Sequence, residues 1–386
     1  MFNPCSPGRI LLRPDLPEWV EPLVAELGKA RRPGSTQVSV AEDAIGRVMD
    51  SLGFSVERQI FTTSARRLYA GSLLGAGLGW VALGLFPLLM LPVDLWIVFT
   101  IGLAALIAVV VVSVGIGAGV LPFEAEPVQA TNLIGTRSSG PLLWLVAHSD
   151  TKAQWLSLRG RVIATVLTGA GSMLLVAALV VRIAGPLPWW VAALLLIPLL
   201  IGSAGLSRPP LHGESPGAVD NGSGVIAALS AAARLSDRQD IGVLITGAEE
   251  FGMEGARAWV QAAGSQGAGF VNFDGIDSVG RFNIMTHRSS PRTDENEERA
   301  KFLHRELRSV LRAGGHTVRD RPLPFGIFVD GSILARGGLW GVTVSRGTWE
   351  TLSVIHTPRD TIERTDVGGA VVAGTATAEA VRRFFC

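Results

Sequence analysis

The sequence has few of the residues that build disulfide scaffolds or nucleic-acid surfaces. Its 386 residues include two cysteines, Cys5 and Cys386, near opposite ends of the chain. They cannot supply a disulfide framework or a cysteine-rich zinc site. The net charge of +1, without a basic patch interleaved with aromatic residues, argues against a nucleic-acid partner. The opening residues, MFNPCSPGRILLRPDLPEWV, lack the apolar core of a secretory signal peptide.

Charged residues are also scarce, at 17% of the chain against 48% hydrophobic residues. They are absent from four apolar stretches, which are residues 69–91, 95–121, 162–181 and 189–206. Each stretch approaches the ~20 apolar residues that cross a bilayer as a helix. Four such runs favour membrane spans over buried helices of a soluble protein. We therefore expect four transmembrane helices in two hairpins.

The hairpins divide the remaining sequence into three pieces. Residues 69–121 and 161–206 are the predicted hairpins, and residues 1–68, 122–160 and 207–386 lie outside them. Together these pieces are long enough for one large domain. Continuous apolar runs at 141–147, 241–246, 269–273 and 340–345, with a further strand at 54–63, predict a largely parallel buried sheet. Helical patterns occur at 38–54, 224–235, 253–263, 295–313 and after Asp366. The fold class is therefore α/β, with helices covering a mixed central sheet in three layers.

Acidic and imidazole side chains follow the predicted strands, precede a helix or, in the case of His356, lie in a loop ahead of Pro358. These residues are His148, Asp150, Asp220, Glu249, Glu250, Asp274 and His356. In α/β sheets, ligands bind at the carboxyl ends of the strands, so we expect these side chains to converge. Imidazole nitrogen and carboxylate oxygen are ligands that suit zinc. A divalent metal would also explain two adjacent glutamates at the end of an apolar strand, because like charges there repel each other.

Five motifs carry a resemblance to a known family. They are HSD, GAVDNGSGV, GAEEFGMEGARAWV, NFDG and HTPRDT, in this order along most of the sequence outside the spans. Together they resemble the co-catalytic dizinc aminopeptidase family, which includes bacterial leucyl aminopeptidases, glutamate carboxypeptidase and glutaminyl cyclase. The transferrin receptor is a relative with an altered site.

The resemblance implies a role for each motif residue. Asp220 would bridge two zinc ions, one held also by Glu250 and His356 and the other by His148 and Asp274. Asp150 would accept the imidazole N–H of His148 and orient that ring. Glu249 would act as the general base, taking a proton from the attacking water and passing it to the leaving amine.

Several features depart from the family or lie outside its motifs. The family uses a tyrosine in some members to stabilise the oxyanion, but the only tyrosine here is Tyr69, at the edge of the first span. Gly331 stands where the family carries a histidine. His212, His287, His304 and His316 are expected on the surface or on helices, Glu254 as a solvated or capping residue, and Asp360 and Thr361 as support for the His356 loop.

The function that these observations favour is a membrane-anchored zinc metallopeptidase, specifically an aminopeptidase acting on peptides. A glutaminyl cyclase and a non-catalytic binding protein stay open as alternatives, and so does the oligomeric state. A transporter is disfavoured because the four spans contain no ionisable residue for a polar pathway.

The charge pattern around the spans predicts on which side the domain lies. Basic residues near the domain-side span ends are Arg66, Arg67, Lys152, Arg159, Arg161 and Arg208, against Arg182 alone on the opposite side. Because basic residues concentrate on the cytoplasmic side, the catalytic domain is expected in the cytoplasm. The best-known peptidases of the family act outside the cytoplasm. The location predicted from the charge pattern therefore differs from the location that the resemblance implies.

Overall fold

The computed structural model describes residues 16–90, 94–185, 188–263, 267–320, 327–364 and 367–385. Cys5, Cys386 and Asp366 lie outside the described residues, and so does Leu91 at the end of the first predicted span.

The domain is built on one mixed sheet with strand order β1-β2-β4-β3-β5-β8-β6-β7. The strands are β1 (Ser55–Thr63), β2 (Val128–Thr136), β3 (Leu143–His148), β4 (Ile241–Thr246), β5 (Gly269–Ile276), β6 (Arg281–His287), β7 (Val318–Arg319) and β8 (Trp340–Gly347). β3, β4, β5 and β8 run parallel, as their continuous apolar sequences predict, and every residue of β3 and β4 is buried. Antiparallel pairing of β1 with β2, β2 with β4 and β6 with β8 makes the sheet mixed, which confirms the predicted fold class.

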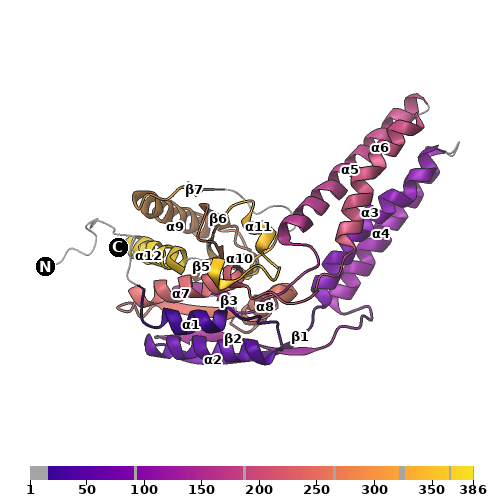
Figure 1. Cartoon of the computed structure of the whole chain (residues 1–386). Helices are drawn as coiled ribbons and strands as arrows, with labels where there is room; N and C mark the ends of the chain where they lie inside the picture. Colours follow the sequence, from indigo (N-terminus) through magenta and orange to yellow (C-terminus); the bar gives the residue numbers. More distant parts are fainter. Residues whose placement is uncertain are drawn as a thin grey trace.

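Helices cover both faces of this sheet (Figure 1). They are α1 (Val20–Leu27), α2 (Thr36–Ser51), α7 (Ser223–Arg234), α8 (Glu254–Ala263), α9 (Asp294–Ala313), α10 (Asp330–Arg336), α11 (Thr351–Val354) and α12 (Val367–Phe384), with short turns η1 (Ala218–Gly222), η2 (Glu249–Phe251) and η3 (Ile362–Arg364). One apolar cluster packs α1, α2, α7, α9 and α12 against the sheet, and a second packs α8 and α10 against Trp144 and Phe270. The three layers are as expected, although the sequence analysis did not identify β2, β6, β7, α1 or α10.

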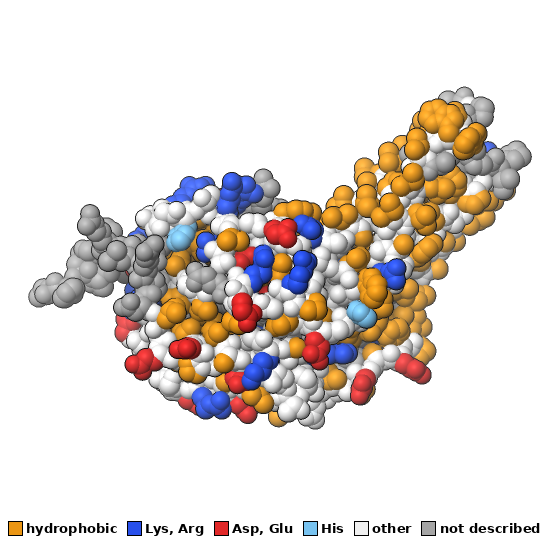
Figure 2. All heavy atoms as spheres, viewed as in Figure 1, with side chains coloured by type: hydrophobic (Ala, Val, Ile, Leu, Met, Phe, Trp, Pro, Cys, Tyr) orange, Lys and Arg blue, Asp and Glu red, His pale blue; other side chains and the backbone are white. Residues whose placement is uncertain are grey.

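Four further helices are long and apolar enough to cross a membrane. They are α3 (Arg66–Met90), α4 (Leu95–Ala118), α5 (Leu158–Ala184) and α6 (Trp189–Leu206). They pack together and project from one end of the domain (Figure 1), and Figure 2 shows their surface to be mainly hydrophobic. The third helix begins earlier than predicted, because Ser157 caps it by accepting a hydrogen bond from Gly160. The second ends at Ala118, because Gly119 adopts a positive φ of 78°.

The sheet topology determines where these helices leave the domain. β1 and β4 each pair antiparallel with β2, so β1 runs in the same direction as β4. α3 follows the carboxyl end of β1, α4 leads into the start of β2, and α5 follows the carboxyl end of β3. Both hairpins therefore join the domain at the edge of the sheet formed by the carboxyl ends of β3, β4 and β5.

Candidate metal centre

The metal ligands expected from the sequence come together at this edge. They form two groups, His148, Asp220 and Asp274 in one and Asp220, Glu250 and His356 in the other. Within each group the potential ligand atoms lie within 4.8 Å of one another. The division matches the one implied by the resemblance, with Asp220 shared between both groups.

The two carboxylate oxygens of Asp220 face different imidazoles. Asp220 Oδ1 lies 3.2 Å from His148 Nε2, and Oδ2 lies 3.1 Å from His356 Nε2. His356 Nε2 is also 3.3 Å from Glu250 Oε1. A carboxylate placed between two separate groups of ligands is the arrangement that a bridging ligand requires.

The Asp220 turn is held by the residues on either side of it. Asn221 donates to the carbonyl of Phe273 at 2.9 Å and accepts from the backbone N–H of Gly275 at 3.2 Å, which ties the turn to the end of β5 beside Asp274. Asp360 accepts the N–H groups of Val219 and Asp220 at 2.7 and 3.2 Å. Its carboxylate thus fixes the Asp220 turn, whereas the sequence analysis assigned it to the His356 loop.

Asp150 connects two of the ligand-bearing segments. Its carboxylate accepts the backbone N–H of Glu249 at 3.0 Å and of Glu250 at 3.1 Å. His148 Nδ1 lies 3.1 Å from the Asp150 backbone carbonyl and 3.7 Å from the carboxylate. The residue expected to orient His148 therefore does so most closely through its main chain, while its side chain positions the glutamate pair.

The site concentrates negative charge away from water. Glu249 is 9% exposed, and its pKa is raised well above the usual value by burial and by the neighbouring carboxylates of Glu250 and Asp330. Burial, together with the charge of Asp220, raises the pKa of Asp274 to about 7. Such a cluster requires compensating cations, and its oxygen and imidazole donors are those that zinc accepts. The residues present therefore fit a zinc site.

Two left-handed backbone positions lie next to these ligands. Ala248, before the glutamate pair, has a φ of 54°, and His356 itself has a φ of 64°. Side-chain-bearing residues adopt this region at a cost of about 1–3 kcal/mol, and such positions cluster at functional sites.

Two basic residues of the site were not recognised from the sequence. Lys152, two residues after Asp150, forms a buried ion pair with Glu250 Oε2. Arg31 is completely buried and donates to the carbonyls of Ser149 at 2.7 Å and Gly217 at 3.1 Å. The position of Lys152 after the HSD motif is a signal that could have been used. Arg31 lies in the basic run KARRP, which is typical of an exposed loop.

The sequence pattern gave no indication of Asp330, and it predicted the wrong location for His287. Asp330, at the start of α10, is buried and hydrogen bonds to Thr246 at the end of β4, and its other oxygen has no hydrogen-bond partner within the described residues. His287 is a half-buried residue of β6, not a surface or helix histidine, and its Nε2 lies 2.8 Å from Thr343 Oγ1. A Cβ on Gly331 would lie 2.8 Å from the same nitrogen. The imidazole of His287 thus lies directly beside Gly331.

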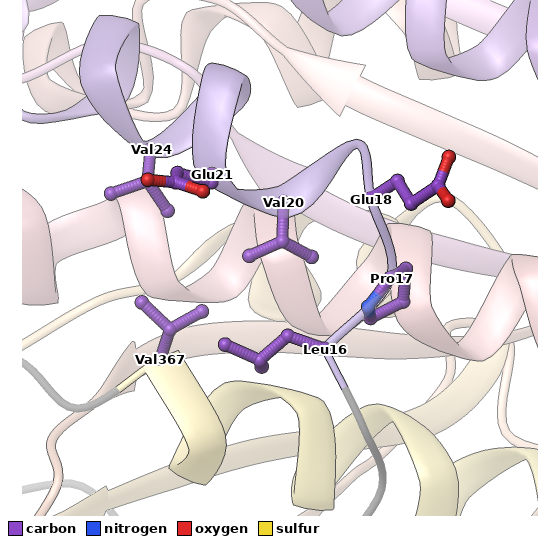
Figure 3. Close-up of a pocket in the computed structure, with 7 residues that line it drawn as sticks. All are labelled: Leu16, Pro17, Glu18, Val20, Glu21, Val24 and Val367. Carbon is purple, nitrogen blue, oxygen red and sulfur yellow. The ribbon is translucent and has the colours of Figure 1, made fainter.

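The other polar residues set aside by the sequence analysis have structural partners. Glu254 pairs with Arg67 at 2.6 Å, His304 with Asp320 at 2.8 Å, and the rings of His212 and His316 pack against Trp155 and Phe282. A separate hollow of about 270 Å³ lies between α1 and the start of α12, lined by Val20, Glu21, Val24 and Val367 among others (Figure 3). None of its lining residues is a predicted ligand.

Comparison with known proteins agrees with the geometry. Residues 204–381 match the model of peptidase family M28. No curated protein sequence matches the chain. Among solved structures, a Zn-dependent exopeptidase from Parabacteroides distasonis is 13% identical with a TM-score of 0.52, over 96% of this chain and 99% of that one.

Two further solved structures of similar fold are a glutaminyl cyclase and an aminopeptidase. A glutaminyl cyclase from Macrostomum lignano is 13% identical with a TM-score of 0.56, over 96% of this chain and 90% of that one. An aminopeptidase from Aneurinibacillus sp. strain AM-1 is 12% identical with a TM-score of 0.52, over 96% and 93%. Residues 204–381 thus match peptidase family M28, and the fold is shared with zinc-dependent exopeptidases and aminopeptidases, so the resemblance to the dizinc aminopeptidase family is confirmed.

Proposed function

We propose that the protein is a membrane-anchored, zinc-dependent aminopeptidase that hydrolyses the bond after the N-terminal residue of a peptide. The observation that carries this proposal is the pair of ligand groups sharing Asp220, with Glu249 buried beside them and belonging to neither. A carboxylate that is close to the ligands but free of them is what a general base needs.

His148 and Asp274 would hold one zinc ion, Glu250 and His356 the other, and Asp220 both. Bound there, zinc supplies Lewis-acid polarisation of the scissile carbonyl and a water acidic enough to react at neutral pH. Glu249 takes the proton of the attacking water and delivers it to the leaving amine nitrogen. Asp150 keeps Glu249 and Glu250 in place through their backbone N–H groups.

Glutaminyl cyclase activity is the second candidate, because several structures of similar fold are glutaminyl cyclases. A non-catalytic binding protein is less well supported, since every expected ligand and the base are present together. The substrates separate the two enzymes: a cyclase acts on N-terminal glutamine without breaking a peptide bond, whereas an aminopeptidase releases the first residue.

The test combines metal analysis with substrate profiling of the purified full chain. We expect about two divalent ions per chain after zinc loading, and activity that is lost with them on chelation. Peptides with free amino termini should be cleaved, and the same peptides with acetylated termini should not. Absence of stoichiometric metal after loading would refute the ligand assignment, and conversion of N-terminal glutamine alone would favour the cyclase.

The topology proposed for the spans places the catalytic domain on the cytoplasmic side. The apolar helices support membrane insertion, and the basic residues near their domain-side ends support this orientation. Cys5 and Cys386 are natural reporters, and Ser139→Cys adds an exposed reporter in a domain loop. A membrane-impermeant thiol reagent should label them only after cell lysis. Labelling in intact cells would place the domain outside.

A further inference from the structure

The segments that carry the ligands also contact the roots of the apolar helices. The strand end with His148 continues directly into α5, which begins at Leu158. Along the way, the N–H of Gln154 donates to the carbonyl of His356 at 3.0 Å. The N–H of Leu158 donates to Ile355 at 3.3 Å, and α11 packs beside the base of α5 (Figure 1). Two ligand segments are thus fastened to the start of one membrane-length helix.

The glutamate segment contacts a second helix root. Phe251, next to Glu250, packs in an apolar cluster with Ala65 and Tyr69 at the start of α3. Arg67 in the first turn of α3 forms an ion pair with Glu254 at 2.6 Å. Through these contacts the candidate metal site lies close to the starts of both α3 and α5.

Residues suited to a lipid headgroup layer lie between the site and the helices. Trp155 follows His148 on its segment and Trp349 precedes His356 on the other, and their side chains are 51% and 52% exposed. Arg208 lies over the Trp155 ring at 5.1 Å, and Arg159 pairs with Glu350 at 2.9 Å. Exposed tryptophans and basic residues at the ends of membrane helices are typical of the interface with anionic headgroups. We name Trp155, Trp349, Arg159 and Arg208 the interfacial collar.

We propose that the collar holds the metal site against the lipid surface, so that the preferred substrates are peptides whose free amino terminus lies a few residues from a membrane-inserted segment. This inference rests on the proposed aminopeptidase function and on membrane insertion of the four helices. When the site lies close to the bilayer, a short tether keeps the amino terminus of an anchored peptide at a high effective concentration near the site. A long flexible tether lowers this concentration, which falls roughly as the −3/2 power of tether length.

The experiment uses the zinc-loaded full chain in nanodiscs containing anionic lipid. The substrates share one free N-terminal sequence and one C-terminal acyl anchor, separated by Gly/Ser spacers of about 5 or about 20 residues. An unanchored peptide with the same N-terminal sequence is the reference. Both anchored peptides partition into the disc equally, so the ratio of their kcat/KM values reports reach alone.

We expect the short-spacer peptide to be cleaved roughly five- to tenfold faster than the long-spacer peptide. Equal rates, or faster cleavage of the long-spacer peptide, would place the site away from the lipid surface and overturn the inference. In both cases cleavage of the unanchored peptide leaves the aminopeptidase assignment intact. Failure to cleave all three peptides would instead refute the proposed function, and the inference with it.

Variants connect this preference to the collar. Replacing both tryptophans (Trp155→Ala, Trp349→Ala) should bring the short-to-long ratio toward one, with each rate normalised to the unanchored peptide. Trp96→Ala is the matched control, because Trp96 is 76% exposed at the opposite end of the bundle. An unchanged ratio in the double variant would show that the collar does not hold the site at the surface.

Discussion

The α/β domain and the four-helix bundle differ in where they place the same apolar residues. In β3, Leu145 and Val146 are completely buried. By contrast, the exposed fractions of Val114 in α4 and Val176 in α5 are 62% and 60%. The bundle buries some apolar side chains, including Leu175 and Leu199, together with small polar ones, and Ser203, Thr168 and Ser72 are all at least nine-tenths covered. The two regions therefore have opposite surfaces, and that of the bundle matches the lipid environment proposed for its helices.

The difference explains what stabilises each region. Water drives Leu and Val into the core of the domain, but lipid is as apolar as those side chains and gives no such drive. Helices in lipid associate through close packing at small residues and through hydrogen bonds. Arg161 of α5 accordingly donates to Ser72 of α3 at 2.9 Å, and Trp80 of α3 donates to Ser207 at the end of α6 at 2.7 Å. Buried ionisable groups, by contrast, are concentrated in the domain, where they form the candidate metal site.

The largest expected effect separates the adjacent glutamates of that site. Glu249→Gln should lower turnover by roughly two to four orders of magnitude, because it removes the general base, while zinc stays bound. Glu250→Gln is the matched comparison: it removes a ligand and should lower metal content. Turnover and metal stoichiometry are measured on the same preparations. Full activity of Glu249→Gln on a peptide that wild type cleaves would exclude the proposed mechanism.

The next effect concerns Arg31, the buried arginine that contacts the loops carrying the candidate ligands. Arg31 is fully buried, where burial lowers its pKa to about 10, so it stays charged at neutral pH while donating to several carbonyls of the ligand loops. Arg31→Met should destabilise the domain by about 3–5 kcal/mol. The substitution removes the hydrogen bonds to these carbonyls and leaves the buried carboxylates nearby without a compensating positive charge. Thermal unfolding in detergent measures this loss. Arg32→Met, at the exposed neighbour, should change stability little, and equal effects of both variants would contradict the assigned role.

The candidate ligands could be predicted from the sequence because each lies in a short local motif, and all of them except His356 follow a predicted strand or precede a helix. The sheet then brings the strand ends together regardless of how far apart they lie in the chain. The buried strands were predictable for the same reason, since their apolar runs are continuous. The apolar helices needed only composition and length.

What the sequence did not reveal depends on contacts between distant segments. Arg31 lies in a polar, basic run, and only its partner Ser149, more than a hundred residues away, explains its burial. The Asp150 carboxylate was assigned to its sequence neighbour His148, yet its oxygens accept from Glu249 and Glu250. Strand β6 and the edge strand β7 carry weak patterns because their residues are only partly buried.

A smaller effect tests the packing rule of the bundle. A Cβ on Gly79 of α3 would lie 2.9 Å from Ser203 Cβ and 3.0 Å from Thr168 Cγ2, whereas one on Gly84 would meet no described atom within 4 Å. Gly79→Val should therefore destabilise the bundle by about 1–3 kcal/mol, as overpacking does. Gly84→Val on the same helix should be tolerated. Unfolding of both variants in detergent compares them, and equal stabilities would mean that the α3–α6 seam does not hold the bundle together.

The smallest effect is a pH dependence that should belong to the domain alone. Glu42 on α2 is 3% exposed, and burial raises its pKa to about 7, against the lowering effect of Arg58 and with a further increase from Asp150 and Asp43. An acid whose pKa is higher in the folded state loses stability as pH rises from its unfolded value, 4.5, through about 7. Glu42→Gln should remove that loss. Its melting temperature should match wild type near pH 4.5 and exceed it at pH 8, by the equivalent of at most about 3 kcal/mol.

Glu57→Gln, at an exposed position of β1, is the control and should follow wild type at both pH values. A Glu42→Gln melting temperature that tracks wild type across this range would show that the ionised carboxylate of Glu42 is accommodated in the fold without cost.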